Sequence, residues 1–199
     1  MGLIESSTKQ RMFLGISKGK ITRRLPNGEG VETYNGFEGH LKGLNERRAT
    51  VNGADTVFVD FIFQDGDTEY NLSVQLASSV ARGIILSLAS IKDFSGNMIK
   101  VSPWLSKDGA YTNISVYNKN EKVGWVTDKI PALKEIHAGS NVYKDDSDRI
   151  EFIRGYIASI QAALAATNGG TQEDGPAPDD LPGDEGEGGF FGNEAPEHL

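Results

Sequence analysis

The chain has 199 residues, a formal net charge of -8 and no cysteine, which excludes disulfides and thiolate metal sites. Residues 171–199 hold nine Asp and Glu and no Lys or Arg, so the remaining 170 residues carry 19 acidic and 20 basic side chains. A body this close to neutral does not exclude an anionic partner.

The N-terminus and the longest apolar stretch both indicate a soluble protein. Residues 1–9 lack the apolar segment of a signal peptide. The longest apolar stretch, residues 84–88, is too short to span a bilayer. We therefore expect a soluble intracellular protein, located in the cytoplasm.

Short strands separated by turns are predicted for the first 76 residues. The turns are Lys18-Gly19, Pro26-Asn27-Gly28, Asn52-Gly53 and Asp65-Gly66-Asp67. The apolar and β-branched runs between them predict strands over residues 11–16, 20–25, 31–44, 56–63 and 70–76. The third of these contains Gly36, Gly39 and Gly43. Glycines inside a strand pattern mark bulges or tight bends, which let a small sheet curl.

The apolar period changes to 3.6 residues after Leu76 and predicts a helix that ends near Ile91, with Ser78 or Ser79 as its N-cap. Alternation returns in residues 98–105 and 111–117, a hairpin with its turn at Lys107-Asp108-Gly109. A short strand over residues 121–126 and a loop containing Pro131 follow.

A second helix is predicted after this loop, with Ser147 as its N-cap. Its apolar residues recur on one face, and they are Ile150, Ile153, Ile157, Ile160 and Leu164.

About five bent strands with one helix before the last hairpin is the arrangement of the OB-fold. We therefore predict a mainly β protein with two helices. Residues 1–146 would form an OB-fold-like small β-barrel, and 147–168 a helix packed on the barrel or on a second copy. Residues 169–199 would be a disordered acidic tail. A small sandwich or another small barrel fits the same pattern.

The tail consists mainly of Gly, Pro, Asp and Glu, so it has too little apolar surface to fold. One interpretation is a solubilising tail without a specific partner. However, such a tail gains nothing from the exposed phenyl rings of Phe190 and Phe191. We therefore expect a docking peptide whose contact residues are Asp179, Asp180, Leu181, Asp184, Glu185, Phe190 and Phe191.

Asp179-Asp180-Leu181-Pro182 resembles the acidic tip of bacterial single-stranded DNA-binding proteins. An acidic tail with late aromatic residues is also similar to the single-stranded DNA-binding proteins of tailed phages. In those families an OB-fold body holds the strand, and the tail recruits replication and repair proteins and competes with DNA. The resemblance covers the 29-residue tail and the general layout of the body. It departs at the end, because eight residues follow Phe191, and the last is Leu199.

Binding of single strands requires cations along a groove and flat side chains on which bases stack. Residues 92–134 carry seven Lys against four acids, interleaved with aromatic residues. Strand alternation places Lys100, Ser102 and Trp104 on one face, and Tyr111 and Tyr117 on one face of the next strand. The candidate contacts here are Lys100, Trp104, Lys107, Tyr111, Tyr117 and Trp125; the alternative for each aromatic is core or rim packing.

The first 50 residues hold nine Lys and Arg against five acids. These cations would contact phosphates if they line the same groove as the hairpin, and are otherwise a solvated face. The candidates are Arg23, Arg24, Lys42, Arg47 and Arg48, with Lys18 and Lys20 nearby.

Neither a catalytic site nor a metal site is indicated. His40, His137 and His198 lack the spacing of metal ligands, and the Asp-rich turns lack a complete calcium-loop pattern. We expect no cofactor and no enzyme activity. The leading hypothesis is a phage or bacterial protein that coats single-stranded DNA in replication, recombination or repair, with the bacterial cytoplasm as its location. The alternative is a non-enzymatic interaction module whose acidic tail binds a basic protein.

Overall fold

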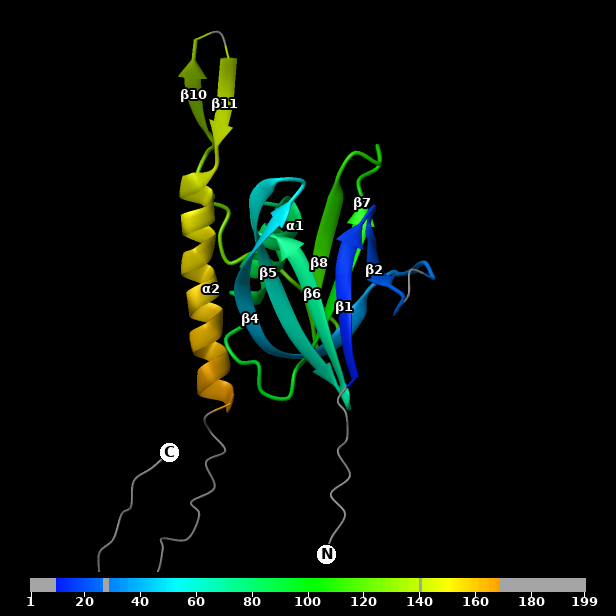
Figure 1. Ribbon diagram of the computed structural model, residues 1–199. Helices are drawn as coiled ribbons and strands as arrows, with labels where there is room; N and C mark the ends of the chain where they lie inside the picture. Colours follow the sequence, from blue (N-terminus) through cyan, green and yellow to red (C-terminus); the bar gives the residue numbers. More distant parts are fainter. Residues whose placement is uncertain (1–9, 27–28, 140, 169–199) are drawn as a thin grey trace, which may run out of the picture.

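The computed structural model describes residues 10–26, 29–139 and 141–168, and within them the chain is mainly β with two helices (Figure 1). In chain order the elements are β1 (Gln10–Ser17), β2 (Lys20–Arg24), β3 (Val31–Tyr34), β4 (Phe37–Val51), β5 (Ala54–Asp65), β6 (Thr68–Gln75), α1 (Ser79–Leu88), β7 (Met98–Leu105), β8 (Thr112–Asn118), β9 (Glu121–Val123), β10 (Lys134–Ala138), β11 (Asn141–Asp145) and α2 (Ser147–Asn168).

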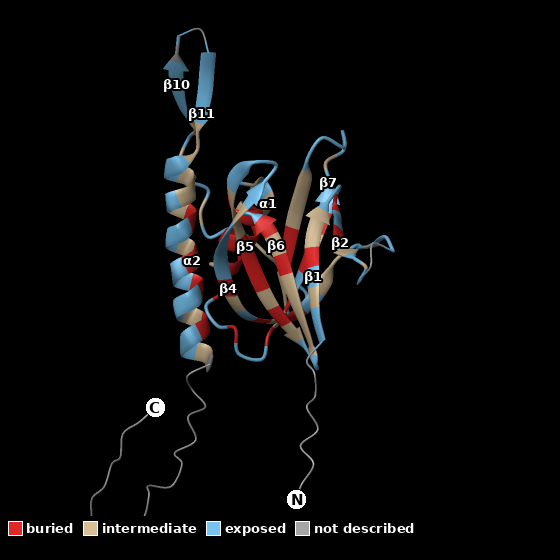
Figure 2. Ribbon diagram, viewed as in Figure 1, coloured by how far each residue is buried: buried red, intermediate tan, exposed pale blue. Residues whose placement is uncertain are grey.

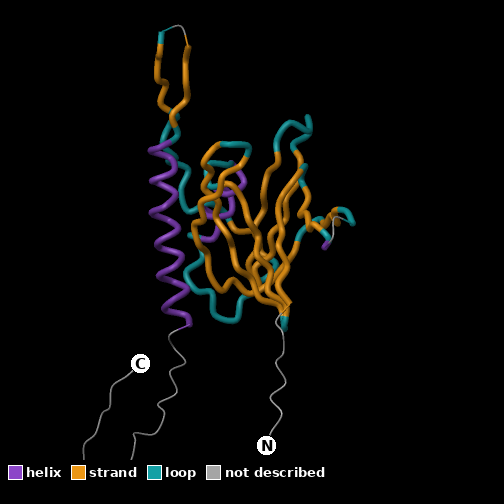
Figure 3. The backbone as a smooth tube through the Cα atoms, viewed as in Figure 1, coloured by secondary structure: helices purple, strands orange, loops and turns teal. Residues whose placement is uncertain are grey.

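Among the described residues, nine strands form one sheet, in the order β3-β2-β1-β6-β5-β4-β7-β8-β9. Figure 3 shows the strands in orange. Neighbouring strands are antiparallel except β1 and β6, which run parallel. The strands predicted from alternation are confirmed, and the run over residues 31–44 is divided into β3 and the start of β4.

The longest strand, β4, carries the bend that its glycines predict. Its pairing with β5 shifts register between Leu41 and Gly43, so Lys42 is the extra residue of a bulge. Just before β4, the backbone at Gly36 lies so close to β7 that a Cβ would be 2.7 Å from the carbonyl oxygen of Val101. Glycine therefore permits the close approach of the strands.

The hydrophobic core lies between the inner face of the sheet and the two helices (Figure 2). Phe61 and Phe63 of β5 and Ile84 and Ile85 of α1 are completely buried there. The predicted apolar stripe of α2 joins the same core, with Ile153, Ile157, Ile160 and Leu164 all buried. The stripe therefore packs on the body of its own chain.

Two polar contacts fix α2 against β4. The Arg154 guanidinium binds the Glu46 carboxylate at 2.9 Å, and the Gln161 side-chain amide donates to the carbonyl of Leu44 at 2.9 Å. Neither of the two described helices is long and apolar enough to cross a membrane.

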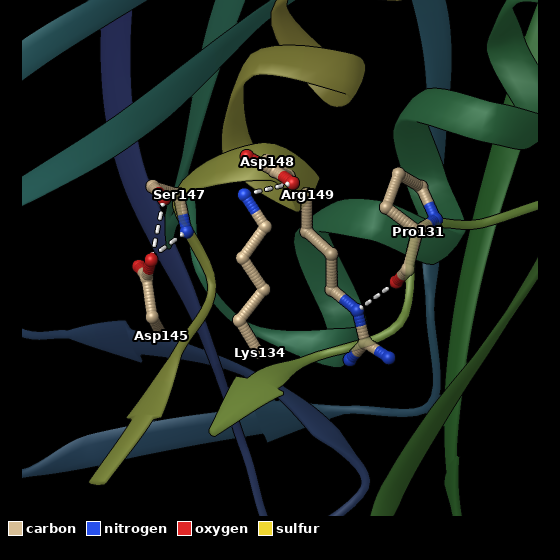
Figure 4. Close-up of polar contacts among 6 residues, drawn as sticks. All are labelled: Pro131, Lys134, Asp145, Ser147, Asp148 and Arg149. Atoms are coloured by element: carbon tan, nitrogen blue, oxygen red, sulfur yellow. Dashed lines mark hydrogen bonds and ion pairs between the residues drawn. The ribbon is translucent and has the colours of Figure 1, made fainter. Parts of the chain in front are cut away.

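The predicted N-cap residue is confirmed for α1, whereas α2 begins one residue earlier than predicted. Ser78 is the N-cap of α1, and its hydroxyl accepts from the backbone N–H of Ala81 at 3.0 Å. In α2, the predicted cap Ser147 is the first helical residue instead. The Asp145 carboxylate accepts from the Ser147 backbone N–H at 3.0 Å and from its hydroxyl at 2.9 Å (Figure 4). These hydrogen bonds hold the pKa of Asp145 below its usual value.

The loop expected before α2 contains a second sheet, the hairpin β10–β11. It projects beyond the N-terminal end of α2, away from the nine-stranded sheet (Figure 1). Its strands place Lys134 opposite Asp145 and Glu135 opposite Lys144, and such opposite charges stabilise cross-strand pairs. Because the hairpin buries little apolar surface, the hydrophobic pattern of the sequence did not indicate it.

We expect Gly83→Ala to destabilise the fold by about 1–3 kcal/mol, because it overpacks the contact between α1 and β8. A Cβ at Gly83 would be 2.4 Å from the branched Cγ2 of Ile114. Urea denaturation measures the effect.

The matched control is Gly155→Ala in α2, where a Cβ would meet nothing within 4 Å. This substitution should raise stability by up to about 1 kcal/mol through helix propensity. Equal effects of the two substitutions would contradict close packing at Gly83.

Candidate nucleic-acid interface

The outward face of β7 and β8 carries an ordered set of polar and aromatic side chains. The strands are antiparallel, and Lys100 lies opposite Tyr117, Ser102 opposite Ser115, and Trp104 opposite Asn113. We call these six residues the β7–β8 platform. The opposite face carries Ile99, Val101 and Val116, all completely buried. The predicted separation of polar and apolar faces on these strands is confirmed.

Trp104 lies on the outside of the sheet with 48% of its surface exposed. Its indole Nε1–H donates to the Ser115 hydroxyl at 3.3 Å, so the ring reaches over the neighbouring strand. An exposed indole held by a hydrogen bond loses little conformational freedom when a base stacks on it.

Cations lie beside the second aromatic residue of the platform. The Lys100 ammonium lies 5.9 Å from the centroid of the Tyr117 ring, within the range of a cation–π contact. Lys122 of β9 lies directly opposite Tyr117 on the other side. On the β4 side, Glu38 lies opposite Lys100, so a carboxylate borders the platform there.

The loop between β7 and β8 presents Lys107 and Tyr111, both exposed. Tyr111 precedes β8 rather than lying on it, and 68% of its surface is exposed. Hydrogen bonds from the Ser106 hydroxyl and the Ala110 backbone N–H hold the pKa of Asp108 below its usual value. This contribution to loop stability is present above the unfolded-state pKa of Asp108 and is lost as the pH falls through the folded value.

The turn between β1 and β2 contacts the end of the β7–β8 hairpin, a contact that the sequence did not indicate. The backbone N–H of Gly19 donates to the Thr112 hydroxyl of β8 at 3.1 Å. A Cβ at Gly19 would lie 2.7 Å from the backbone nitrogen of Leu105. Lys18 and Lys20 flank this glycine and are exposed.

A hollow of about 600 Å³ extends from the platform toward the turn before β4. The Lys20 ammonium donates to the side-chain oxygen of Asn35, and the Ser102 hydroxyl donates to the Asn35 carbonyl at 3.2 Å. Tyr34, with 43% of its surface exposed, lines the hollow. Its hydroxyl donates to Glu32, and this hydrogen bond raises the pKa of Tyr34.

Trp125, predicted together with Trp104, lies apart from the platform. It follows β9, and its Cζ2 lies 3.9 Å from where a Cβ of Gly83 in α1 would stand. Helix α1 contacts the apolar face of β8. The two tryptophans therefore lie on opposite sides of β8.

The other N-terminal cations lie on β2 and β4, and two of them are paired with carboxylates. Arg47 and Arg48 are adjacent in β4, so their side chains point to opposite faces. Arg47 binds the Asp60 carboxylate at 2.9 Å, and Arg23 binds Glu32 at 3.3 Å. Lys42 stands exposed at the bulge of β4.

Arg24 lines a second groove, of about 520 Å³, between β1 and β6. Phe13 and Phe58 also line this groove, and 65% of the Phe13 surface is exposed. The Arg47 guanidinium lies 5.1 Å above the Phe58 ring. The strand pattern held a signal for Phe13, because alternation groups it with Arg11 rather than with Met12 and Leu14.

Within residues 10–26, 29–139 and 141–168, no group of three or more acidic or histidine side chains is arranged to hold a metal ion. His40 is half-buried in β4, with its Nδ1 3.1 Å from the carbonyl oxygen of Asn97. The predicted tail contacts lie outside the described residues; they are Asp179, Asp180, Leu181, Asp184, Glu185, Phe190 and Phe191.

No family model, curated protein or solved structure matches this chain.

We expect Gly19→Ala to destabilise the protein by about 1–3 kcal/mol more than Gly109→Ala. Both glycines have positive φ, +69° and +71°, so backbone strain costs both variants a similar amount. Only at Gly19 would the added Cβ meet the backbone of β7, since at Gly109 nothing lies within 4 Å. Chemical denaturation compares the pair, and equal losses would argue against the close contact of the β1–β2 turn with β7.

Proposed function

We propose that this chain binds single-stranded DNA without sequence preference and coats it during replication, recombination or repair. It would act without catalysis, and its acidic C-terminal segment would recruit partner proteins. The observation that carries the proposal is the β7–β8 platform, where an exposed Trp104 and a lysine-flanked Tyr117 share one face.

The order of the central strands supports an OB-fold-like body. β6-β5-β4-β7-β8 are neighbours in the sheet, and α1 lies between β6 and β7 in the chain. In the OB-fold, one of the loops that bind oligonucleotides joins the last two strands. Here that position is the β7–β8 loop, which exposes Lys107 and Tyr111.

The mechanism we propose is electrostatic capture followed by base stacking. Lys100 and Lys122 lie on either side of Tyr117, Lys20 reaches Asn35 beside Ser102, and these lysines would neutralise phosphates. Each base stacked on an aromatic side chain contributes about 1–3 kcal/mol. Release of counterions from the neutralised phosphates makes such binding depend on salt.

Binding of fluorescent oligo-dT, measured at two salt concentrations with and without residues 171–199, tests the proposal directly. We expect affinity to fall with salt and to rise when the nine acidic residues of that segment are removed. The same measurement with oligo-U compares the affinity for RNA with that for DNA. Absence of binding by the shortened protein would overturn the proposal.

Trp104→Ala should weaken oligo-dT binding about 5- to 100-fold, because one stacking surface is lost. Trp125→Ala is the matched control: it removes a tryptophan of similar exposure, 49% against 48%, on the other side of β8. Fluorescence anisotropy gives both affinities, and circular dichroism checks folding. Equal losses of affinity in the two variants, or no loss in either, would show that the platform is not the binding site.

The β10–β11 hairpin favours a second candidate, an interaction module that binds protein rather than DNA. Ile136, Val142 and Tyr143 are each more than 50% exposed on this projecting element. Failure of DNA binding, together with capture of a basic partner by the acidic segment, would support this alternative.

A further inference from the structure

A pocket of about 330 Å³ lies where α1, β11 and α2 meet, away from the platform. Three cationic side chains line it, one from each element: Arg82, Lys144 and Arg149. Asp146 supplies one carboxylate. The pocket therefore carries a charge of about +2 and is walled by apolar groups such as Leu133 and Ile153.

Arg82 is held in this pocket with an unsatisfied donor. Its Nε is buried and has no hydrogen-bond partner among the described residues. A buried N–H without an acceptor costs about 1–3 kcal/mol, and more when the group is charged. Burial and the nearby Arg149 also lower the pKa of Arg82. Both effects favour the binding of an anion beside Arg82.

The loop before the β10–β11 hairpin positions Arg149 beside Arg82. Its Nε donates to the carbonyl oxygen of Pro131 at 2.5 Å, which directs the guanidinium (Figure 4). Close by, Lys134 binds Asp148 at 2.6 Å and joins β10 to α2 (Figure 4). The two arginines are thus fixed on packed helices, although their charges repel each other.

The charge of the pocket selects among anions. A carboxylate ligand has two oxygens and a single negative charge. That is less than the charge of about +2 that remains after the Asp146 carboxylate is counted. A phosphate group has up to two negative charges and three acceptor oxygens, which matches the excess charge and the three cations. Guanidinium groups bind phosphate with two parallel hydrogen bonds. The volume leaves room for the group that carries the phosphate.

We propose that the Arg82 pocket binds a phosphate group, either free or as part of a nucleotide. The inference does not depend on the proposed binding of single strands, since the pocket shares no residue with the platform.

Thermal unfolding of the full chain tests whether the pocket binds phosphate. It is measured in chloride, phosphate, dTMP or malonate at matched ionic strength. Wild type should melt about 3 °C higher with phosphate at ten times its Kd. Arg82→Gln should lose this rise and melt in chloride no lower than wild type, because a half-buried guanidinium that repels Arg149 is removed. A larger rise with dTMP than with phosphate identifies a nucleotide as the source, and an equal rise identifies free phosphate.

Lys92→Gln is the matched control, because it removes an exposed charge outside the pocket and should keep the full rise. Lys144→Gln removes an exposed charge that lines the pocket, and should weaken phosphate binding about tenfold without disturbing the fold. Malonate equal to phosphate, or an undiminished rise in both Arg82→Gln and Lys144→Gln, would overturn the proposal.

Discussion

The pairing of one long strand with two neighbours is the constraint on which the rest of the sheet depends. β4 pairs with β5 through most of its length, while its first residues pair with β7. β4 forms both sets of backbone hydrogen bonds because it bends at the Lys42 bulge. Gly36 allows the chain just before β4 to pass close to Val101. Without this bend, β7 would lose its pairing with β4, and the strands that carry Trp104 and Tyr117 would not be joined to the rest of the sheet.

Local patterns predicted much of the fold, because alternation and helical period depend on neighbours in the chain. They placed Val101 inside and Trp104 outside, and Ser78 at the start of α1. They did not indicate the contact of Gly19 with Thr112, which joins residues 93 positions apart. They also missed the β10–β11 hairpin, which is held by cross-strand pairing rather than by burial.

The candidate site shows why counting charges along a sequence overstates the cations available to a ligand. Arg23 and Arg47 belong to the densest basic pairs, yet each is bound to a carboxylate of a neighbouring strand. Such pairs lose part of their attraction for an outside anion. By contrast, Lys18 and Lys20 flank Gly19, which the fold packs against the backbone of Trp104 and Leu105. Which cations are free is decided by strand register, and a single sequence does not reveal register between distant strands.

Helix α1 joins the two proposed sites through consecutive residues. Arg82 lines the pocket shared with α2, while Gly83 lies against Ile114, whose strand carries the platform on its other face. Close-packed helices move as rigid units, so a displacement of α1 at one residue is transmitted to the next. Thermodynamic linkage then makes any cooperativity reciprocal: a ligand at Arg82 changes affinity at the platform by the same factor as the platform's ligand changes affinity at Arg82.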